Sequence, residues 1–378
     1  MVQQYVADVA PLSASSRAVV IEILVHGAQS RAQLAARMGL SAATLTRLVR
    51  PLVDAGVLVE SDAVRTSGRG RSSLPLDVVP EQYRFLGVKL TTESMYAVAT
   101  DLRARVLDQQ VVPIRSLRVP DVVAAVSDIV RGFEARSDRP VDGVGVTVGG
   151  TVEAGEIVVD SPFLHWHDVP LRSLLSRHVK APVHLDNDVV GLTKAQHWFG
   201  HGKGYASFAL LTVGAGIGFG LVVNNDMVPT RVAPISHYPV DASGPLCPLG
   251  HRGCMTAYLA SDSITAAVSV GHGRAVSYAE VLELAKANDP VAHRVVCEAA
   301  RALGRTAAAI GSLTGVERII LSGEGVHLAE LAWTSVERGL TEYDVPGGHH
   351  GEPVVRPMDF LEWARGAAAL AIQAEFPG

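Results

Sequence analysis

Cysteine is scarce in this sequence, and no run of apolar residues is long enough to cross a lipid bilayer. Three cysteines among 378 residues are too few for a disulfide framework, which excludes the disulfide-rich secreted class and favours a reducing compartment. The first residues, which include Asp8, lack the uninterrupted apolar core of a signal peptide. A transmembrane helix needs about 20 predominantly apolar residues, which no segment offers. We therefore expect a cytoplasmic protein with no membrane partner.

Charged residues are also few, and lysine is absent from the first 80 positions. Charged residues make up 19% and hydrophobic residues 48% of the chain, which excludes a disordered protein and allows two or three globular domains. Residues 1–80 contain eight Arg and six Asp or Glu, so they carry +2 of a total net charge of −5, and the remainder carries −7. Arginine recognises phosphate and guanine edges, so this region is a candidate for binding nucleic acid.

Three short helices are predicted near the start of the chain. Residues 15–27 begin with Ser and end at Gly27, while Ser30 and Gln33 have the spacing of a capping box for a second helix. After a tight turn at Gly39, Ser41 can cap a third helix with one apolar face. In a helix-turn-helix, the later helix of the pair has small and hydrogen-bonding residues at its exposed start, as the predicted third helix has. The alternative is an αα-hairpin with a polar outer face.

The third helix and the segment after it supply the candidate DNA-binding residues. The alternation after Val57 predicts a two-stranded wing, and residues 68–71 predict a flexible cationic arm. Pro51 removes a backbone donor and disfavours helical geometry before it, so we expect a kink or a new helix start there. We expect Ala43, Thr44 and Arg47 to read bases, and Arg50, Arg69 and Arg71 to hold phosphates. Ser41 and Thr46 complete the set of candidate DNA-binding residues.

The rest of the chain repeats one plan. Short β-rich runs at 85–90, 95–101 and 106–113 predict a meander, followed by a helix and a buried strand; strands at 206–213 and 217–223 open a second lobe. Two such lobes imply a central cleft. The predicted fold class is α/β. The predicted domains are residues 1–80, residues 81–196 with 359–378, and residues 197–358.

Several motifs fall where this cleft is expected. His237, Cys247 and Cys254 are zinc-binding residue types in a loop rich in Pro and Gly, although four ligands are usual; the alternative is two buried thiols in a surface loop. The run at 214–218 suits a tight hairpin turn and a phosphate loop equally well. His165 and Trp166 could stack on a sugar ring, or Trp166 could belong to the core.

Together with the helix-turn-helix pattern at 31–49, Asp186-Asn-Asp188 and the loop at 237–254 resemble the ROK family of repressors and sugar kinases. The resemblance covers nearly the whole chain. It implies a winged helix followed by a two-lobed, actin-like ATPase fold with zinc in the loop. It also implies that Asp188 is at the general-base position, and that Gly150, Asn187, Asp188 and His237 bind the effector. The alternative for Asn187 and Asp188 is an Asx turn closing a strand.

The departures from this family's kinase pattern are as informative as the matches. Lys89-Leu-Thr-Thr92 stands where the kinases have Asp-x-Gly-Gly-Thr, so no productive nucleotide site, and no ATP, is expected. Ala233-Pro234 and Thr256 replace both glutamates of the zinc loop, which removes hydrogen bonds of about 1.5–3 kcal/mol each and predicts poor binding of an ordinary hexose. Leu249 replaces one cysteine, and His251 is the candidate fourth zinc ligand.

The sequence thus predicts a transcription factor, a repressor rather than an enzyme, with Asp188 as a vestigial general base. Its partners would be double-stranded operator DNA with an inverted repeat, a second copy or three further copies of the chain, and a small effector such as a sugar or oligosaccharide. Two alternatives stay open: an ATP-dependent sugar kinase that carries a DNA-binding domain, and a DNA-binding protein that responds to no ligand.

Overall fold

Serine side chains mark the starts of the first three helices. The computed structural model describes residues 13–60, 74–229, 235–342 and 351–376. Ser13, Ser30 and Ser41 each accept a backbone N–H three positions on, which satisfies a free donor at the helix start. The predicted capping box between Ser30 and Gln33 is confirmed. The helices are α1 (Ala14–His26), α2 (Arg31–Arg37) and α3 (Ala42–Asp54).

The predicted wing is present, and no new helix starts at Pro51. β1 (Leu58–Glu60) and β2 (Leu76–Val78) pair in antiparallel fashion. α3 continues through Pro51 to its end at Asp54, so the expected helix start at that proline is wrong. Pro51 is exposed and lies in the last turn of α3, where water can bind the carbonyl that loses its helical partner.

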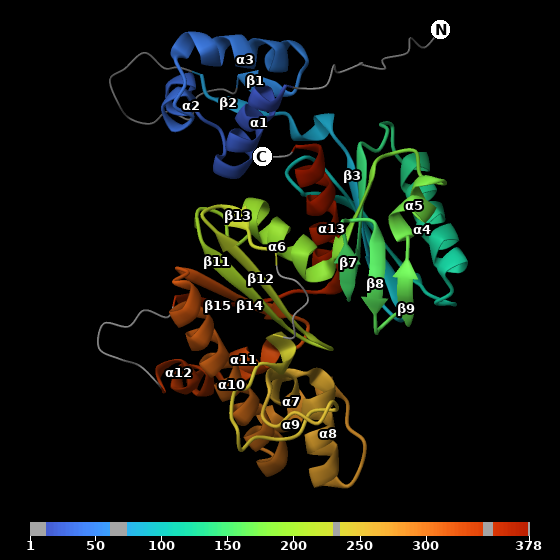
Figure 1. The fold of residues 1–378 in the computed structure, drawn as a ribbon, viewed down its shortest axis with the longest axis vertical. Helices are drawn as coiled ribbons and strands as arrows, with labels where there is room; N and C mark the ends of the chain where they lie inside the picture. Colours follow the sequence, from blue (N-terminus) through green and yellow to red (C-terminus); the bar gives the residue numbers. More distant parts are fainter. Residues whose placement is uncertain (1–12, 61–73, 230–234, 343–350, 377–378) are drawn as a thin grey trace.

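The predicted meander forms half of a five-stranded sheet. The strand order is β10-β6-β3-β4-β5; β3, β4 and β5 are antiparallel, whereas β3, β6 and β10 are parallel. The helix α4 (Val119–Ala135) covers one face and α13 (Phe360–Glu375) covers the other (Figure 1). The strands are β3 (Phe85–Leu90), β4 (Ser94–Thr100), β5 (Val106–Pro113), β6 (Gly143–Val148) and β10 (Val183–Asn187).

Two strand glycines allow α13 to lie unusually close to this sheet. A Cβ atom on Gly87 would lie 2.0 Å from the carbonyl oxygen of Ala364, and one on Gly145 would lie 1.7 Å from that of Ala367. No side chain fits into these spaces. The backbone of α13 therefore packs directly on β3 and β6.

A second five-stranded sheet has the order β13-β12-β11-β14-β15. Its strands are β11 (Phe208–Val213), β12 (Ile217–Val223), β13 (Asp226–Met227), β14 (Arg318–Gly323) and β15 (Glu352–Pro357). The long helix α10 (Pro290–Thr314) covers one face, while α6 (Asp188–Phe199) packs on the other through Leu192. α6 and α13 therefore lie between the two sheets, as Figure 1 shows.

Several elements were not expected from the sequence pattern. β15 adds a parallel neighbour to β14, and a separate sheet of three short antiparallel strands follows β6. The remaining elements are β7 (Thr151–Glu153), β8 (Ile157–Ser161), β9 (Trp166–Val169), α5 (Leu171–Ser176), α7 (Met255–Leu259), α8 (Ser261–His272), α9 (Tyr278–Lys286), α11 (His327–Leu331) and α12 (Trp333–Thr341), with 3₁₀ turns at Pro80–Gln82 and Ile235–His237.

The winged helix shares its hydrophobic core with the first sheet. Val20 and Ile23 of α1 belong to the same buried cluster as Trp198 of α6 and Ala368 and Ile372 of α13. Figure 1 shows α1 lying against the ends of these helices. The winged helix is thus attached by apolar packing as well as by the connecting chain. Among the described residues no helix is both long and apolar enough to cross a membrane.

Candidate functional site

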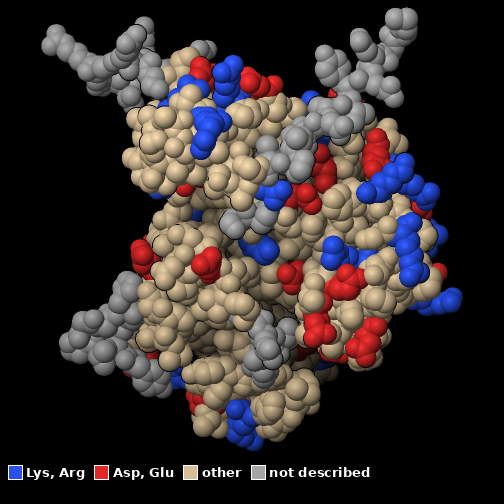
Figure 2. Space-filling model, turned by 45° about the horizontal axis from the view of Figure 1, so that its top comes forward, with Lys and Arg blue, Asp and Glu red and all other residues tan. Residues whose placement is uncertain are grey.

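The outer face of α3 is exposed, as a helix that reads DNA requires. Ala43, Thr46, Arg47 and Arg50 are exposed, whereas Leu45, Val49 and Leu52 on the opposite face are buried. Ser41 holds the start of this helix through the Thr44 amide. Figure 2 shows basic side chains on the surface of the winged helix, interspersed with acidic ones, and the sequence makes all of these basic side chains arginines. The helix therefore presents a short polar surface at its N-terminal half.

The arginines of the winged helix differ in their availability. Arg31 pairs with Glu60 at 2.5 Å, and Arg37 pairs with Glu22 at 2.5 Å, so these two guanidinium groups are engaged within the domain. Arg50 lies 3.8 Å from its helix neighbour Asp54. In the parts of the chain that the structure describes, Arg47 forms no ion pair. The predicted phosphate contacts Arg69 and Arg71 lie outside the described residues.

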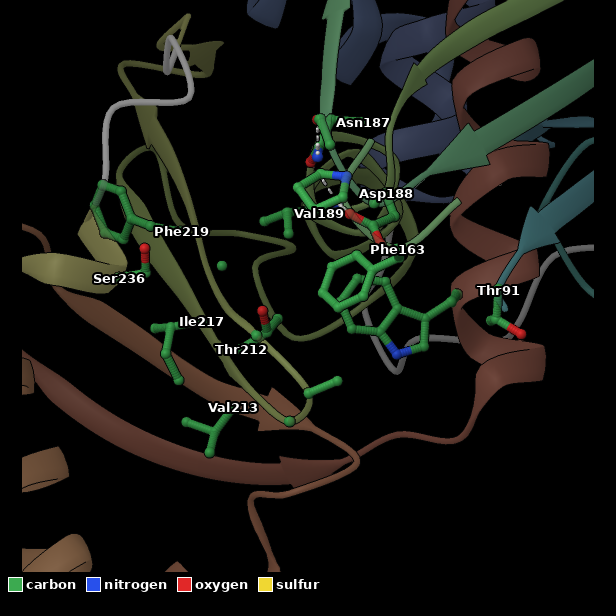
Figure 3. A pocket seen from close by; sticks show the side chains of 18 of the residues that line it. Thr91, Phe163, Asn187, Asp188, Val189, Thr212, Val213, Ile217, Phe219 and Ser236 are labelled. Atoms are coloured by element: carbon green, nitrogen blue, oxygen red, sulfur yellow. Dashed lines mark hydrogen bonds between the residues drawn. The ribbon is translucent and has the colours of Figure 1, made fainter. Parts of the chain in front are cut away.

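A cavity of about 960 Å³ lies between the two sheets. The carboxyl ends of β3, β6 and β10 line one side, and the hairpin of β11 and β12 lines the other. Figure 3 shows Phe163, Asn187 and Asp188 across the space from Ile217 and Phe219. The cavity is at the upper end of the range of about 300–1,000 Å³ that is typical of small-molecule sites.

Asn187 and Asp188 are largely engaged within the chain. The Asn187 side chain donates to the Gly150 carbonyl at 2.7 Å and accepts the Val189 and Val190 amides, so it caps α6. Asn187 thus matches the alternative interpretation, in which its side chain forms an Asx turn at the end of a strand. The neighbouring Asp186 does not line the cavity; burial raises the pKa of its carboxyl group.

Lys89 and Asp188 form an ion pair at the centre of this site. The side chains of Lys89 and Asp188 are only 7% and 14% exposed, and the Lys89 ammonium lies 5.5 Å from the ring centre of Trp363. An acid at the general-base position is therefore paired with a cation from β3. The carboxylate oxygen that a substrate hydroxyl would need as its acceptor is therefore already engaged by Lys89.

A second acidic side chain, Glu324, lies over the turn that joins β11 and β12. Its Oε1 accepts the Ala215 backbone N–H at 2.9 Å, and a Cβ on Gly214 would lie 1.9 Å from the same oxygen. Nearby, burial raises the pKa of Tyr278, and the Glu324 carboxylate adds to this shift. The chain thus places its own anion on an amide of the candidate phosphate loop.

Of the two interpretations of Trp166, the core one is confirmed. Trp166 is 4% exposed, and its indole N–H donates to the Leu117 carbonyl at 2.7 Å, so it belongs to the core. His165 is exposed and lies outside the cavity lining. The aromatic side chain that does line the cavity on this side is Phe163, which is 43% exposed.

The predicted zinc ligands meet at one point. The Sγ atoms of Cys247 and Cys254 lie 3.7 and 3.6 Å from Nδ1 of His237. With the fourth candidate, His251, all four potential ligand atoms lie within 4.8 Å of one another. Tetrahedral zinc with Zn–S of about 2.3 Å and Zn–N of about 2.0–2.1 Å requires S···N separations of roughly 3.6 Å. The residues therefore fit a zinc ion.

The surroundings of His237 favour its neutral form. Burial, and secondarily the charge of His251, lower the pKa of His237, and a neutral imidazole is the form that binds a metal. His237 also lines the cavity. A metal in this loop would therefore fix part of the cavity wall.

Sequence reasoning missed Phe163, Glu324 and Trp363. The run Ser322-Gly-Glu-Gly325 lies at the end of β14 and could have indicated Glu324, because strand ends face the expected cleft. The ion pair of Lys89 with Asp188 could likewise have been inferred from two parallel strands that end at the same edge. Nothing in the sequence of α13 distinguishes Trp363 from an ordinary core residue.

Residues 85–374 match the ROK family, and residues 12–59 match the family described as winged helix-turn-helix DNA-binding. The xylose repressor of Bacillus subtilis (strain 168) is 24% identical over 275 residues, which cover 71% of each chain. The N-acetylglucosamine repressor of Escherichia coli O157:H7 is 24% identical over 382 residues, covering 96% of this chain and 93% of that repressor.

Solved structures show the same fold. A ROK family transcriptional regulator, described as a homolog of the E. coli MLC protein, has a TM-score of 0.80 at 22% identity and covers 96% of this chain and 97% of its own. A ROK family glucokinase from Streptomyces griseus has a TM-score of 0.65 at 23% identity and covers 77% of this chain and 99% of its own. The match to the transcriptional regulator covers nearly the whole chain and so includes the winged helix. The match to the glucokinase covers 77% of the chain, and the part left outside it is large enough to hold the winged helix.

Replacing Lys89 by Met tests the central ion pair. The change leaves the Asp188 carboxylate in a nearly enclosed position without its counter-ion, and breaking a buried pair in this way costs about 3–5 kcal/mol. We expect a corresponding loss in the free energy of unfolding, measured in urea at pH 7. The double variant Lys89→Met with Asp188→Leu should recover most of that loss, because no charge stays behind. A Lys89→Met protein as stable as the parent would show that the pair contributes little.

Proposed function

Since the chain belongs to the ROK family and carries a winged helix-turn-helix, we propose that it is a transcriptional repressor whose kinase-like cleft senses a small ligand and transfers no phosphate. One observation carries the proposal: the winged helix shares a buried core with α13, and the first turn of α13 lines the cleft. A sensor requires such a connection between the two sites. We further propose that the protein acts in the cytoplasm, where operator DNA is found.

The proposed DNA contact uses the exposed face of α3. Ala43, Thr44 and Arg47 would read base edges in the major groove, and Arg50 would bind phosphate. Paired copies of the chain, as a homodimer or homotetramer, would place two winged helices on the two halves of an inverted repeat. Arg47 has no ion-pair partner among the described residues, which supports its role, because no such pair is given up on binding.

Two helices provide the route from ligand to DNA. α6 begins at Asp188 in the cleft and ends next to the winged helix, where Trp198 joins the shared core. α13 presents Phe360 and Trp363 to the cleft and Ile372 to the same core. A ligand that moves either helix start would therefore shift the winged helix. The effect is regulatory only if the ligand binds the two arrangements with different affinity.

Two charged side chains support the proposal that this chain transfers no phosphate. Lys89 occupies the general-base carboxylate Asp188, and Glu324 occupies the Ala215 amide. A phosphate oxygen on that amide would lie roughly 4 Å from the Glu324 carboxylate, where two like charges repel by about 4 kcal/mol at an effective dielectric constant near 20. The absence of flexible glycines after β3 adds to this argument.

The proposed domains are residues 1–80 for DNA binding, residues 81–196 with 359–378 for the first lobe, and residues 197–358 for the second. We propose that zinc, held by His237, Cys247, Cys254 and His251, braces the second lobe where it meets the cleft. Its chemistry would be structural, because all four positions of a tetrahedral ion are then taken by protein. All four predicted effector residues, Gly150, Asn187, Asp188 and His237, line the cleft.

Arg47→Ala tests the DNA-binding half of the proposal. The full-length variant should bind an operator duplex, chosen as one that the parent protein prefers to random DNA, about 1–3 kcal/mol more weakly. It should also discriminate less between bases, because one side chain that contacts base edges is lost. Arg131→Ala is the control, since Arg131 is 72% exposed and lies on α4. The measurement is a titration of fluorescent operator and random duplexes at fixed salt. Parental affinity and discrimination in Arg47→Ala would refute the assignment.

A coupled ADP-release assay tests the absence of phosphate transfer. With ATP, Mg²⁺ and a panel of sugars, we expect the full chain to release no ADP above background, because both the base and the loop amide are occupied. Added hexokinase confirms in the same wells that the assay works. Sugar-dependent release that Asp188→Asn abolishes would establish an active kinase instead.

Metal analysis tests the zinc site. We expect about one zinc ion per purified chain, loss of that zinc in Cys254→Ser, and easier removal by chelator in His251→Ala, because each change removes one ligand. His178→Ala, which alters an exposed histidine outside this cluster, should keep its zinc. A parent protein without zinc would contradict the site, and parental retention in His251→Ala would exclude His251 as a ligand.

A further inference from the structure

A second cavity, of about 410 Å³, lies beside the core that the winged helix shares with the first sheet. The end of α1, the turn between β4 and β5, the end of α6 and the first turns of α13 line it. No described residue lines both this cavity and the cleft. Its volume falls within the range of about 300–1,000 Å³ that is typical of small-molecule sites.

Basic side chains outnumber acidic ones around this cavity. Among the described residues that line it, Arg103, Arg105, Lys203 and Arg365 bring four positive charges and Glu362 brings one negative charge, which leaves an excess of three. A concave surface lined mainly by charges of one sign concentrates the electric field and attracts ions of the opposite sign. The cavity is therefore suited to an anion.

Two of these four basic side chains are engaged within the chain. Arg365 pairs with Glu362 at 2.8 Å and donates to the Ala104 carbonyl at 2.8 Å. Arg103 pairs with Asp77 of β2, so it links the wing to the first lobe at the edge of the cavity. These contacts hold both guanidinium groups in place.

Arg105 and Lys203 are the available cations. Both are exposed, and in the part of the chain that the structure describes neither side chain forms an ion pair or a hydrogen bond. An anion that binds them therefore displaces no acidic partner. Arginine can donate two parallel N–H groups to one phosphate, and lysine adds a compact positive charge.

The turn between β4 and β5 holds its two arginines at the cavity. Asp101, which is 2% exposed, accepts the backbone N–H of Arg103 at 2.8 Å and that of Arg105 at 2.9 Å. Ala104, between them, has a φ of 54°, in the left-handed region that residues other than glycine rarely adopt. Such conformations cost free energy and cluster at ligand sites. The turn is thus fixed by its own hydrogen bonds before any ligand binds.

Apolar surface lies beside the cations. Val106 is 42% exposed and Phe199 is half-buried, and both line the cavity. Apolar surface of this kind favours a ligand with a carbon skeleton, which it removes from water. The combination of cations and apolar side chains therefore suits an organic anion better than a bare ion.

We propose that this cavity binds a small phosphate ester. The phosphate group faces Arg105 and Lys203, and the carbon skeleton contacts Val106 and Phe199. A phosphate monoester carries about 1.5–2 negative charges at pH 7, which offsets most of the positive excess. DNA also carries phosphate, but Figure 1 shows α1 between α3 and the first lobe, so DNA on the outer face of α3 lies away from this cavity. The inference does not rest on the proposed function.

Calorimetry on the full-length protein tests the site, with glycerol 3-phosphate and phenyl phosphate as probes. Glycerol and phenol are the uncharged counterparts, and every titration is made at pH 7 and one ionic strength in a buffer without phosphate. We expect at least one ester to bind with a dissociation constant below about 1 mM, and its counterpart to bind at least about tenfold more weakly. Weaker binding of both esters, or equal affinity of ester and counterpart, would overturn the proposal.

Two variants locate the phosphate group. Arg105→Gln and Lys203→Gln should each weaken the ester at least about fivefold, because each removes one charge-assisted contact. Arg131→Gln, at a residue 72% exposed on α4, is the matched control and should keep the parental affinity. Circular dichroism confirms that each variant is folded. Parental affinity in either cavity variant would contradict the assigned position.

The double variant Lys89→Met with Asp188→Leu distinguishes this cavity from the cleft. Among the described residues that line the cleft, Lys89 is the one lysine or arginine, so an ester bound there would lose its cation. We expect the double variant to bind the ester with parental affinity. A loss of affinity at least as large as in Arg105→Gln would place the ester in the cleft and refute the inference.

The salt dependence of binding to a random DNA duplex distinguishes an ester site from a DNA contact. Each phosphate contact that is lost lowers the slope of log affinity against log salt by about 0.9. We expect Arg105→Gln and Lys203→Gln to keep the parental slope. A slope smaller by about one in either variant would assign that cation to the DNA backbone and so exclude the ester site.

Discussion

The packing of α13 against both the first sheet and the winged helix is the constraint on which the rest of this structure depends. Glycines at Gly87 and Gly145 bring the helix backbone onto the strands, and its other side completes the core under α1. A helix held this closely on two sides cannot shift relative to one without disturbing the other, because protein interiors are close-packed. The orientation of the DNA-reading helix is therefore tied to the lobe that lines the cleft.

Two internal charge contacts in the cleft support its proposed role as a binding site that transfers no phosphate. Lys89 pairs with the Asp188 carboxylate, which a substrate hydroxyl would need as its acceptor. Glu324 accepts the Ala215 N–H, which a phosphate would need as a donor. Both contacts are made by side chains that reach into an otherwise unaltered fold.

Local features of the fold could be predicted from the sequence, whereas long-range pairings could not. The serine caps of α2 and α3 and the β-rich runs of β3, β4 and β5 depend on residues a few positions apart, so their patterns can be read directly from the sequence. Lys89 and Asp188 are 99 positions apart, and Glu324 and Ala215 are 109 apart. Such contacts are set by strand order. The strand order was only partly predictable, because β15 and the sheet of β7, β8 and β9 lack strong alternation.

The composite core also governs when the protein can fold during synthesis. Ile23 of α1 and Ala364 of α13 belong to one buried cluster although they lie about 340 residues apart. At about 5–20 residues per second, a ribosome needs roughly 15–70 s to make the intervening chain. During that interval the winged helix exposes apolar surface that α13 will later cover. An incomplete chain therefore has a DNA-reading helix but lacks part of its support, so a nascent repressor is in greater need of chaperones than its separate domains would suggest.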